Sequence, residues 1–489
     1  MKPLKSTGAA GLSRRDFLQA IGGTTASISL SSGTLLGAGA VARASTGRKK
    51  AAIVRGAFIY PPTESLRQVG YYSWPGSTFD AEGRQAKYMK SIRQIERKLG
   101  IRIVMDEKPL DTADDTARFV AGIQQAETDG LLLIPFKKGH WGHVTRIVEE
   151  TQIPTVVLAT LGILLVGHVK QLHREPGVFL INSLDNLDAV EDGMKMIRTA
   201  CRMKQSRIVN LRGAEPNETT VPHIGTTVRT LPRARFVDEF TRTDVTPAVK
   251  ALAKSYMTDA EKVLEPTKAD IVEAAKTYFA LRRIIEAEKA DAVMMDCLPG
   301  LRRPHTHVPP CMGYMSLRDE GVPAGCESDL DATLTLMLLQ QLFDKPGFQH
   351  NPTVDTEKNH YFCAHCTSAS KMKGSNAPAE PYVLMNHAEA GWGCVPRVLF
   401  TPGQDITIAK YLSVTGDSEE RPQMLVYSGQ VIGCPPVPQT GGCRTNAETT
   451  INELGDVCDL KGHHLCMIYG DCARRLRQFC RLYRIDAVT

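Results

Sequence analysis

Between residues 51 and 296 the sequence alternates short apolar runs with longer segments of helical spacing. This alternation limits the possible folds more than any other feature of the chain. Apolar runs predict strands at 51–54, 101–105, 130–136 and 154–160, and helical spacing predicts helices at 81–99, 112–128 and 144–150. Because these strands are largely apolar on both faces, we expect a parallel sheet that helices cover on both sides.

A second block of the same kind follows. It predicts strands at 178–181, 207–211 and 292–296 and helices at 187–201 and 269–288. Together the two blocks predict an α/β fold with two Rossmann-like, doubly wound domains, at 50–172 and 173–320. Asn182 lies at a strand end, where such sheets bind ligands, although a helix cap is an equally ordinary role for this segment.

The pattern changes at about residue 321. One strongly apolar helix is predicted at 332–343, and short strands follow at 361–365, 382–386, 406–412 and 424–432, separated by Gly and Pro. A final helix is predicted at 473–482. We therefore expect a third, β-rich α+β domain at 321–489 that is barrel-like.

The first 44 residues are typical of a twin-arginine signal peptide. Arg14 and Arg15 stand in Ser-Arg-Arg-Asp-Phe-Leu, a mildly apolar segment follows, and Ala42-Arg43-Ala44 offers a cleavage site. We expect the protein to be exported in its folded state to a periplasmic or extracytoplasmic location. Outside this segment no apolar run is long enough to span a membrane, so we expect no membrane association after cleavage.

Charge and cysteine content exclude some functions. The net charge is +6, and much of it lies in the signal segment, so nucleic-acid binding is not expected. The 13 cysteines are odd in number and scattered, which does not indicate a disulfide framework. Cys363 and Cys366 form one Cys-x-x-Cys pair, which fits either a zinc or iron–sulfur site or two small buried side chains.

Four residues of the C-terminal region are candidates for a metal site: Glu327, Asp355, His365 and His464. Two carboxylates and two imidazoles suit a divalent cation that keeps positions open for a polyol, and a carboxylate pair can move a proton between adjacent sugar carbons. Each residue also has an ordinary structural interpretation. Glu327 could cap a helix, although Asp329 is better placed for that; Asp355 could belong to a turn, and the histidines could be structural.

The order of these motifs resembles the L-fucose isomerase and L-arabinose isomerase superfamily. The resemblance rests on Ala-Gly-Cys-Glu-Ser-Asp before an apolar helix, then Pro-x-x-Asp-Thr, Ala-His-Cys-Thr and Gly-His-His before a strand that ends in Tyr-Gly-Asp. These motifs span residues 321–471, and the two preceding α/β domains extend the resemblance to 50–489. Exported, fucose-isomerase-like proteins are the most similar members.

The resemblance implies a function and a set of roles. Glu327 would be a metal ligand and a proton-transfer group, and Asp355 would be the second carboxylate, with Asn351 competing for that position. His464 and His365 would be further ligands. The family binds Mn²⁺ (another divalent cation would serve the same chemistry) and interconverts an aldose and its ketose through a cis-enediol. Its active sites lie at subunit boundaries, which implies a homo-oligomer, either a trimer or a hexamer.

Other residues are candidates for binding the sugar: His140 and Trp141, His387, Arg444 and Asn351. Each has an alternative role in a helix start, a turn or a surface ion pair. The expected function is a metal-dependent ketol isomerase acting on a deoxy sugar such as fucose. The alternatives are a non-catalytic, exported carbohydrate-binding protein on the same fold, and a metal-dependent lyase or hydrolase.

Overall fold

The apolar strands of the N-terminal block pair in parallel. The computed structural model describes residues 49–69, 79–414, 420–436 and 442–489, so the predicted signal segment 1–44 lies outside the described residues. The first sheet has the order β2-β1-β3-β4-β5, which is a common order of doubly wound sheets. Its strands are β1 (Ile53–Ile59), β2 (Arg102–Met105), β3 (Gly130–Pro135), β4 (Thr155–Thr160) and β5 (Val178–Ser183).

The helices of this region show why the periodicity was informative. In α3 (Ala81–Leu99) the buried residues Tyr88, Ile92, Ile95 and Leu99 recur every three or four positions and form one apolar stripe. The side chain of Asp80 caps its first turn by accepting from Gly83 N. The other helices here are α2 (Thr63–Val69), α4 (Ala113–Gln124), the 3₁₀ turn η1 (Lys138–His140), α5 (Trp141–Thr151), α6 (Val166–Leu172) and α7 (Leu187–Lys204).

Strand β5 joins the first sheet rather than the second. Its residues Val178–Ser183 pair in parallel with Thr155–Thr160 of β4. The first sheet therefore extends past residue 172, where the sequence pattern placed the domain boundary. Local hydrophobicity identified the strand but carried no information on which sheet it would join.

The second sheet has the order β11-β10-β6-β8-β7. All its pairings are parallel except that of the exposed edge strand β7 with β8. Its strands are β6 (Arg207–Leu211), β7 (Asn217–Thr220), β8 (Thr227–Leu231), β10 (Ala292–Met295) and β11 (Ala324–Cys326). Its helices are α8 (Ala234–Thr241), α9 (Pro247–Asp259), α10 (Lys268–Ala287), α11 (Leu298–Leu301) and α12 (Cys311–Asp319). The two parallel sheets confirm the predicted α/β class.

The C-terminal region contains a closed six-stranded β-barrel, which confirms the predicted barrel-like character. The ring runs β16-β19-β12-β13-β18-β17 and closes by pairing of β16 with β17. Its strands are β12 (Phe348–Asp355), β13 (His360–His365), β16 (Asp405–Leu412), β17 (Gln423–Gly433), β18 (Thr445–Thr449) and β19 (Leu465–Tyr469). Strand β20 (Asp486–Val488) adds to β17, and a small separate sheet contains β9 (Lys262–Val263), β14 (Tyr382–Met385) and β15 (Val395–Val398).

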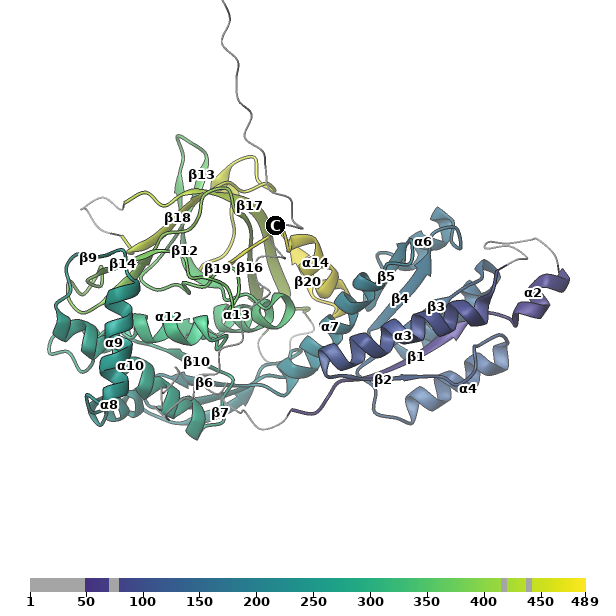
Figure 1. The fold of residues 1–489 in the computed structure, drawn as a ribbon, viewed down its shortest axis with the longest axis horizontal. Coiled ribbons are helices and arrows are strands. Elements are labelled where there is room, and N and C mark those ends of the chain that lie inside the picture. Colours follow the sequence, from purple (N-terminus) through teal and green to yellow (C-terminus); the bar gives the residue numbers. More distant parts are fainter. Residues whose placement is uncertain (1–48, 70–78, 415–419, 437–441) are drawn as a thin grey trace, which may run out of the picture. The chain divides into compact units, whose positions relative to one another are not determined.

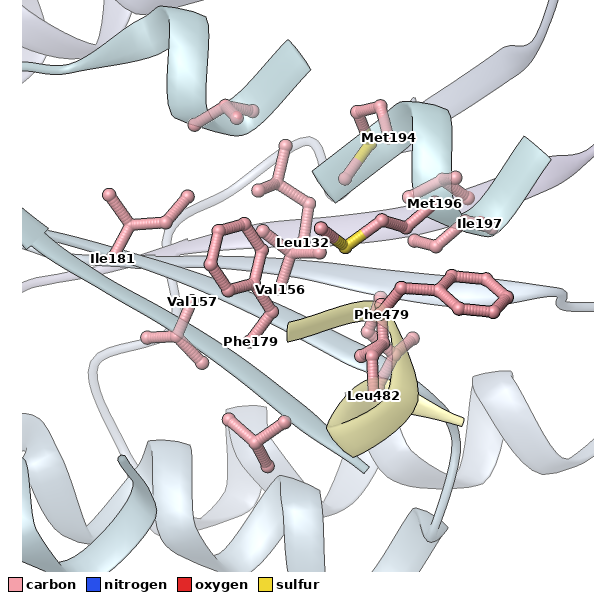
Figure 2. Packing of buried hydrophobic residues seen from close by; sticks show 14 of the residues in the cluster. Leu132, Val156, Val157, Phe179, Ile181, Met194, Met196, Ile197, Phe479 and Leu482 are labelled. Carbon is pink, nitrogen blue, oxygen red and sulfur yellow. The ribbon is translucent and has the colours of Figure 1, made fainter. Parts of the chain in front are cut away.

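Two helices connect the barrel to the sheets (Figure 1). Helix α13 (Leu330–Phe343) contacts β10 and β11 as well as β16 and β19, which explains why it is apolar on nearly all sides. Helix α14 (Ala473–Leu482) contacts β5 and β17. Its residues Phe479 and Leu482 belong to the same buried cluster as Phe179 of the first sheet (Figure 2). The short turn η2 (Val457–Asp459) precedes β19.

Two further observations concern the chemistry available to the chain. Among the described residues, no helix combines the length and apolarity that crossing a bilayer requires. All 13 cysteines are described and are free thiols. Cys363 and Cys366 lie in different buried clusters, so their Cys-x-x-Cys spacing does not produce a shared site.

Candidate metal centre

Glu327 lies in a tight turn between β11 and α13, at the carboxyl end of a parallel strand. Glu327 and Ser328 both adopt the left-handed backbone conformation, with φ of 58° and 57°. Such angles are costly for residues other than glycine, so the surrounding contacts must impose them. Ser328 N donates to Met295 O at 3.1 Å, and Asp329 Oδ1 caps α13 by accepting from Ala332 N at 2.8 Å. The turn therefore directs the Glu327 carboxylate out of the sheet edge, where parallel sheets bind ligands.

His464 reaches the same place from the start of β19. Its Nδ1 lies 3.0 Å from Asp329 Oδ2, and its Nε2 lies 3.7 Å from Glu327 Oε2. A neutral imidazole whose Nδ1–H is held by a carboxylate presents its Nε2 lone pair on the other side of the ring. That Nε2 is buried and has no hydrogen-bond partner in the described part of the chain. Asp329 thus orients His464 toward Glu327.

Lys410 of β16 completes this arrangement behind the histidine. Its Nζ lies 2.8 Å from Asp329 Oδ2 and donates to His463 O at 2.5 Å. Burial alone would raise the pKa of Asp329, but hydrogen bonds from His464, Lys410 and the Ala332 N–H lower it to about 2. The carboxylate therefore stays ionised and fixes the orientation of His464 across the physiological pH range.

His365 ends β13 beside His464, with the two ring centroids 5.8 Å apart. The side chain is 3% exposed, and neither ring nitrogen has a partner among the residues that the structure describes. Burial lowers the pKa of His365 to about 3, so the ring is neutral and both nitrogens are available as donor or ligand atoms. Unsatisfied buried polar atoms are rare, and a ligand that binds here would satisfy them.

A thiol also joins this group. Cys326 Sγ, a Glu327 carboxylate oxygen and a His365 ring nitrogen all lie within 4.8 Å of one another. The structure thus brings together Glu327, His365 and His464, three of the four predicted ligands, and adds Cys326. Carboxylate, imidazole and thiol groups at this spacing, with unsatisfied nitrogens, fit a divalent cation.

Asp355 is not part of this group. Strand β12 pairs with β13 so that Asn351 lies opposite Ala364, next to His365, while Asp355 lies opposite His360 at the tip of the hairpin. Four residues of extended strand separate the two positions by about 13 Å. The Asp355 carboxylate instead accepts from the N–H groups of Glu357 and Lys358 in the hairpin turn. The expected convergence of Asp355 on Glu327 is therefore wrong in its geometry, and Asn351 lies at the position nearer the site.

Asn351 and His387 flank the centre. Asn351 Nδ2 lies 4.0 Å from Cys443 Sγ. His387 is buried in a turn after β14, and its Nδ1 accepts from Ala390 N at 3.2 Å. Burial alone would lower the pKa of His387, but Cys366, Glu389 and Glu327 raise it. His387 is therefore close enough to Glu327 to sense its charge, as a residue that lines a sugar pocket would be.

The Glu327 carboxyl has the electrostatics of a proton-transfer group. Burial raises its pKa, the nearby carboxylate of Glu389 adds to the increase, and His464 opposes it. A carboxyl group with a raised pKa takes up a proton more readily than an ordinary carboxylate.

Two of the remaining predicted sugar contacts, His140 and Trp141, belong to the first sheet's region. His140 Nε2 bonds Asp111 Oδ1 at 2.8 Å, at the edge of the first sheet. Trp141 is 4% exposed, packs in the core of that sheet and donates to Gln171, so neither face of its ring is open to a sugar. Arg444 joins two loops by donating to Asn386 O at 2.9 Å and pairing with Glu265 at 3.7 Å.

A separate cleft of about 550 Å³ lies along β5 and α14, with Asn182, Asp471 and Arg474 in its wall. Asp471 follows the end of β19 opposite to His464, so this cleft is not the space around Glu327. The predicted helix-cap role near Asn182 falls to Asn186, which accepts from Ala189 N.

Comparison with known proteins gives a partial likeness. No protein-family model matches the chain. Two curated proteins named sulfoquinovose isomerase, from Priestia aryabhattai and Priestia megaterium, are each 24% identical to it over 225 residues. The match covers 42% of this chain and 45% of each relative, so the chain spans less than half the length of these proteins. Over that part the chain is similar to a sugar isomerase, and the likeness is not specific to fucose isomerases.

Proposed function

We propose that this protein is a metal-dependent aldose–ketose isomerase with its active site around Glu327. The observation that carries the proposal is the convergence of Glu327, His365 and His464. Within the described part of the chain, both ring nitrogens of His365 and the Nε2 of His464 are buried without a hydrogen-bond partner. The likeness to proteins named sulfoquinovose isomerase supports the reaction class. Glu327, His365 and His464 would hold the cation, and Mn²⁺ is the first ion to test because the resemblance implies it.

A bound divalent cation would polarise the substrate carbonyl and offset the negative charge of the enediolate. The protein residues move the carbon-bound proton and position the sugar. Glu327 takes the proton from the carbon beside the carbonyl and returns it to the former carbonyl carbon, on the same face of a cis-enediol. The proton of the neighbouring hydroxyl passes to the former carbonyl oxygen, so that the new carbonyl and the new hydroxyl form together. The raised pKa of its carboxyl strengthens Glu327 as the base that takes up the proton.

Asn351 limits the proton transfers that the site can perform, because it supplies an amide and not a second carboxylate. Its amide can donate to and accept from a sugar hydroxyl, but it cannot take up a proton. We therefore assign both carbon-proton transfers to Glu327 alone and a sugar-positioning role to Asn351 and His387. The same asparagine favours the second candidate, a carbohydrate-binding protein without turnover, because a family-like acid–base pair is absent.

The experiment that tests the proposal is a pair of matched substitutions in the mature protein. Glu327→Gln removes a ligand and the proton carrier, whereas Asp355→Asn changes a carboxylate of the hairpin tip. We expect about one divalent cation per chain in the wild type and in Asp355→Asn, and little or none in Glu327→Gln. Equal metal content in all three proteins would contradict the assignment.

Substrate and activity are tested on the metal-loaded protein. The panel begins with sulfoquinovose, which the relatives' name supplies, and continues with deoxy aldoses such as fucose. An isomerase yields a ketose of unchanged mass, whereas a lyase or hydrolase changes the mass. Saturable sugar binding without conversion of any member would favour the binding protein.

We also propose that the chain is exported through the twin-arginine pathway and assembles into a homo-oligomer. Cell fractionation of the wild type and an Arg14→Lys/Arg15→Lys variant tests export, because the variant should stay in the cytoplasm. Light scattering of the purified protein tests assembly, with a trimer or hexamer expected.

A further inference from the structure

The backbone of Cys326 is fixed beside the candidate ligands by a buried glutamine. Cys326 ends β11, and the amide of the buried Gln349 clamps both of its backbone groups. Cys326 N donates to Gln349 Oε1 at 2.9 Å, and Gln349 Nε2 donates to Cys326 O at 3.1 Å. This clamp joins β11 to β12 and fixes the position from which the Cys326 side chain extends.

The spacing of the donor atoms around this thiol is close to, but wider than, that of a shell around a bound ion. Bonds of about 2.0–2.3 Å place the donors of a tetrahedral ion about 3.3–3.8 Å apart. Glu327 Oε2 and His464 Nε2 are 3.7 Å apart, and Cys326 Sγ, Glu327 and His365 lie within 4.8 Å of one another. A small inward movement of side chains would bring Cys326, Glu327 and His365 onto one ion, and His464 Nε2, beside Glu327 Oε2, offers the fourth donor.

The unsatisfied atoms point to the same conclusion independently. The structure describes no hydrogen-bond partner for His365 Nδ1, His365 Nε2 or His464 Nε2, although all three atoms are buried. Protein interiors seldom leave several polar atoms of one cluster unpaired unless a ligand or water completes them. Two imidazoles with unpaired ring nitrogens, beside a thiol and a carboxylate, are a group of side chains that can bind a metal ion.

We propose that Cys326 is a thiolate ligand of the metal and that the site selects a borderline cation of the zinc, cobalt(II) or iron(II) class over Mn²⁺. The inference rests on the proposed function, since it concerns the same site. One thiol and two imidazoles outnumber the single carboxylate, and sulfur and nitrogen donors favour these ions, whereas manganese favours oxygen. A second carboxylate at position 351 would add an oxygen donor and lessen that preference, and the chain has Asn351 there.

Binding would break the Cys326 S–H bond and form a sulfur–metal bond, with the proton released to solvent. Four protein donors fill a tetrahedral shell. A sugar oxygen can still enter because zinc expands to five ligands.

Cobalt(II) titration of the metal-free, full-length mature protein tests the proposal. Thiolate ligation produces an intense sulfur-to-cobalt charge-transfer absorption in the near ultraviolet, which oxygen and nitrogen ligands do not produce. We expect this band at one equivalent in the wild type. Cys326→Ser should abolish it and weaken zinc binding about tenfold or more, since even outer-shell substitutions cost 10–100-fold.

Cys297→Ser is the matched control, because its thiol lies 3.9 Å from Cys326 Sγ and is equally buried. It should keep the band. Stoichiometric cobalt binding by the wild type without the band would overturn the thiolate assignment and leave the proposed function intact. Loss of the band in Cys297→Ser but not in Cys326→Ser would also overturn it. Absence of any metal binding by the wild type would defeat both proposals.

The choice of metal has its own measurement. Equal concentrations of Zn²⁺ and Mn²⁺ are offered to the wild type and to Asn351→Asp, and the bound metal is analysed. We expect zinc to prevail in the wild type and the manganese share to rise in Asn351→Asp. A wild type that takes mostly manganese would contradict the proposal, whatever its spectrum with cobalt.

Discussion

Replacement of Asp329 by asparagine should damage both the fold and the metal centre. The variant keeps the helix cap, because an asparagine Oδ1 can still accept from Ala332 N. It loses the charge that faces Lys410 and His464. The pKa of Asp329 falls from 3.8 to about 2 on folding. That shift corresponds to about 2 kcal/mol of stability from the ionised carboxylate.

The buried lysine adds to this loss. The Lys410 side chain is 8% exposed, and its Nζ pairs with Asp329 at 2.8 Å. Removal of one partner of a buried pair typically costs about 3–5 kcal/mol. We therefore expect Asp329→Asn to lose between about 2 and 5 kcal/mol of unfolding free energy at pH 7, and metal affinity to fall by about 10–100-fold. Because the folded-state pKa is depressed, the carboxylate contribution is present above about pH 4 and disappears as the pH falls through about 2.

Equilibrium urea unfolding and metal titration measure the two effects. Asp331→Asn is the control, because Asp331 lies on the same helix but its carboxylate accepts from Ser413 rather than from a ligand. The double variant Asp329→Asn/Lys410→Met should be more stable than Asp329→Asn alone, since no buried charge remains unpaired. A loss below about 1 kcal/mol with unchanged metal affinity would refute the reasoning.

Three further substitutions test other parts of the structure. Asp355→Asn should change stability by no more than about 0.5 kcal/mol in urea unfolding, because the residue lies in an exposed turn. Gly325→Ala should cost about 1–3 kcal/mol and reduce metal content. Its Cβ would meet Thr333 Oγ1 at 1.9 Å, whereas Gly455→Ala meets nothing within 4 Å and serves as the control. Burial lowers the pKa of His350 to about 3. Unfolded chains gain that proton near pH 6.5, so stability should fall as the pH drops from about 6.5 toward 3, and His350→Gln should lessen this slope in unfolding curves taken across the window.

The sequence predicted elements well where one periodicity dominated. The helix at 81–99 and the strand at 207–211 have the expected bounds, because each has a continuous apolar pattern. The assignment of β5 to a sheet failed, since a parallel strand finds its partners through crossover connections that local patterns do not encode. The second sheet's antiparallel edge strand β7 escaped notice because all its residues are exposed.

The candidate site could also be predicted from the sequence only in part. The resemblance selected Glu327, His365 and His464, and the structure brings them together. Strand periodicity could not choose between Asn351 and Asp355, because residues four apart share one face of a strand. The hairpin register decided it.

Cys326 was overlooked because a small apolar residue at the end of a buried strand is ordinary there. Its position directly before Glu327 was the signal that could have revealed it.

Closure of the barrel has a consequence for how the protein acquires its ion. His365 and His464 lie on strands that become neighbours of a shared ring only when β12 pairs with β19, although about a hundred residues separate the two histidines in sequence. An unfinished chain therefore lacks the assembled ligands, so the proposed ion would bind late in folding. For a protein exported after folding, as we propose, the cytoplasmic metal pool would then determine which ion is bound. The metal content of the compartment in which the protein works would not affect that choice.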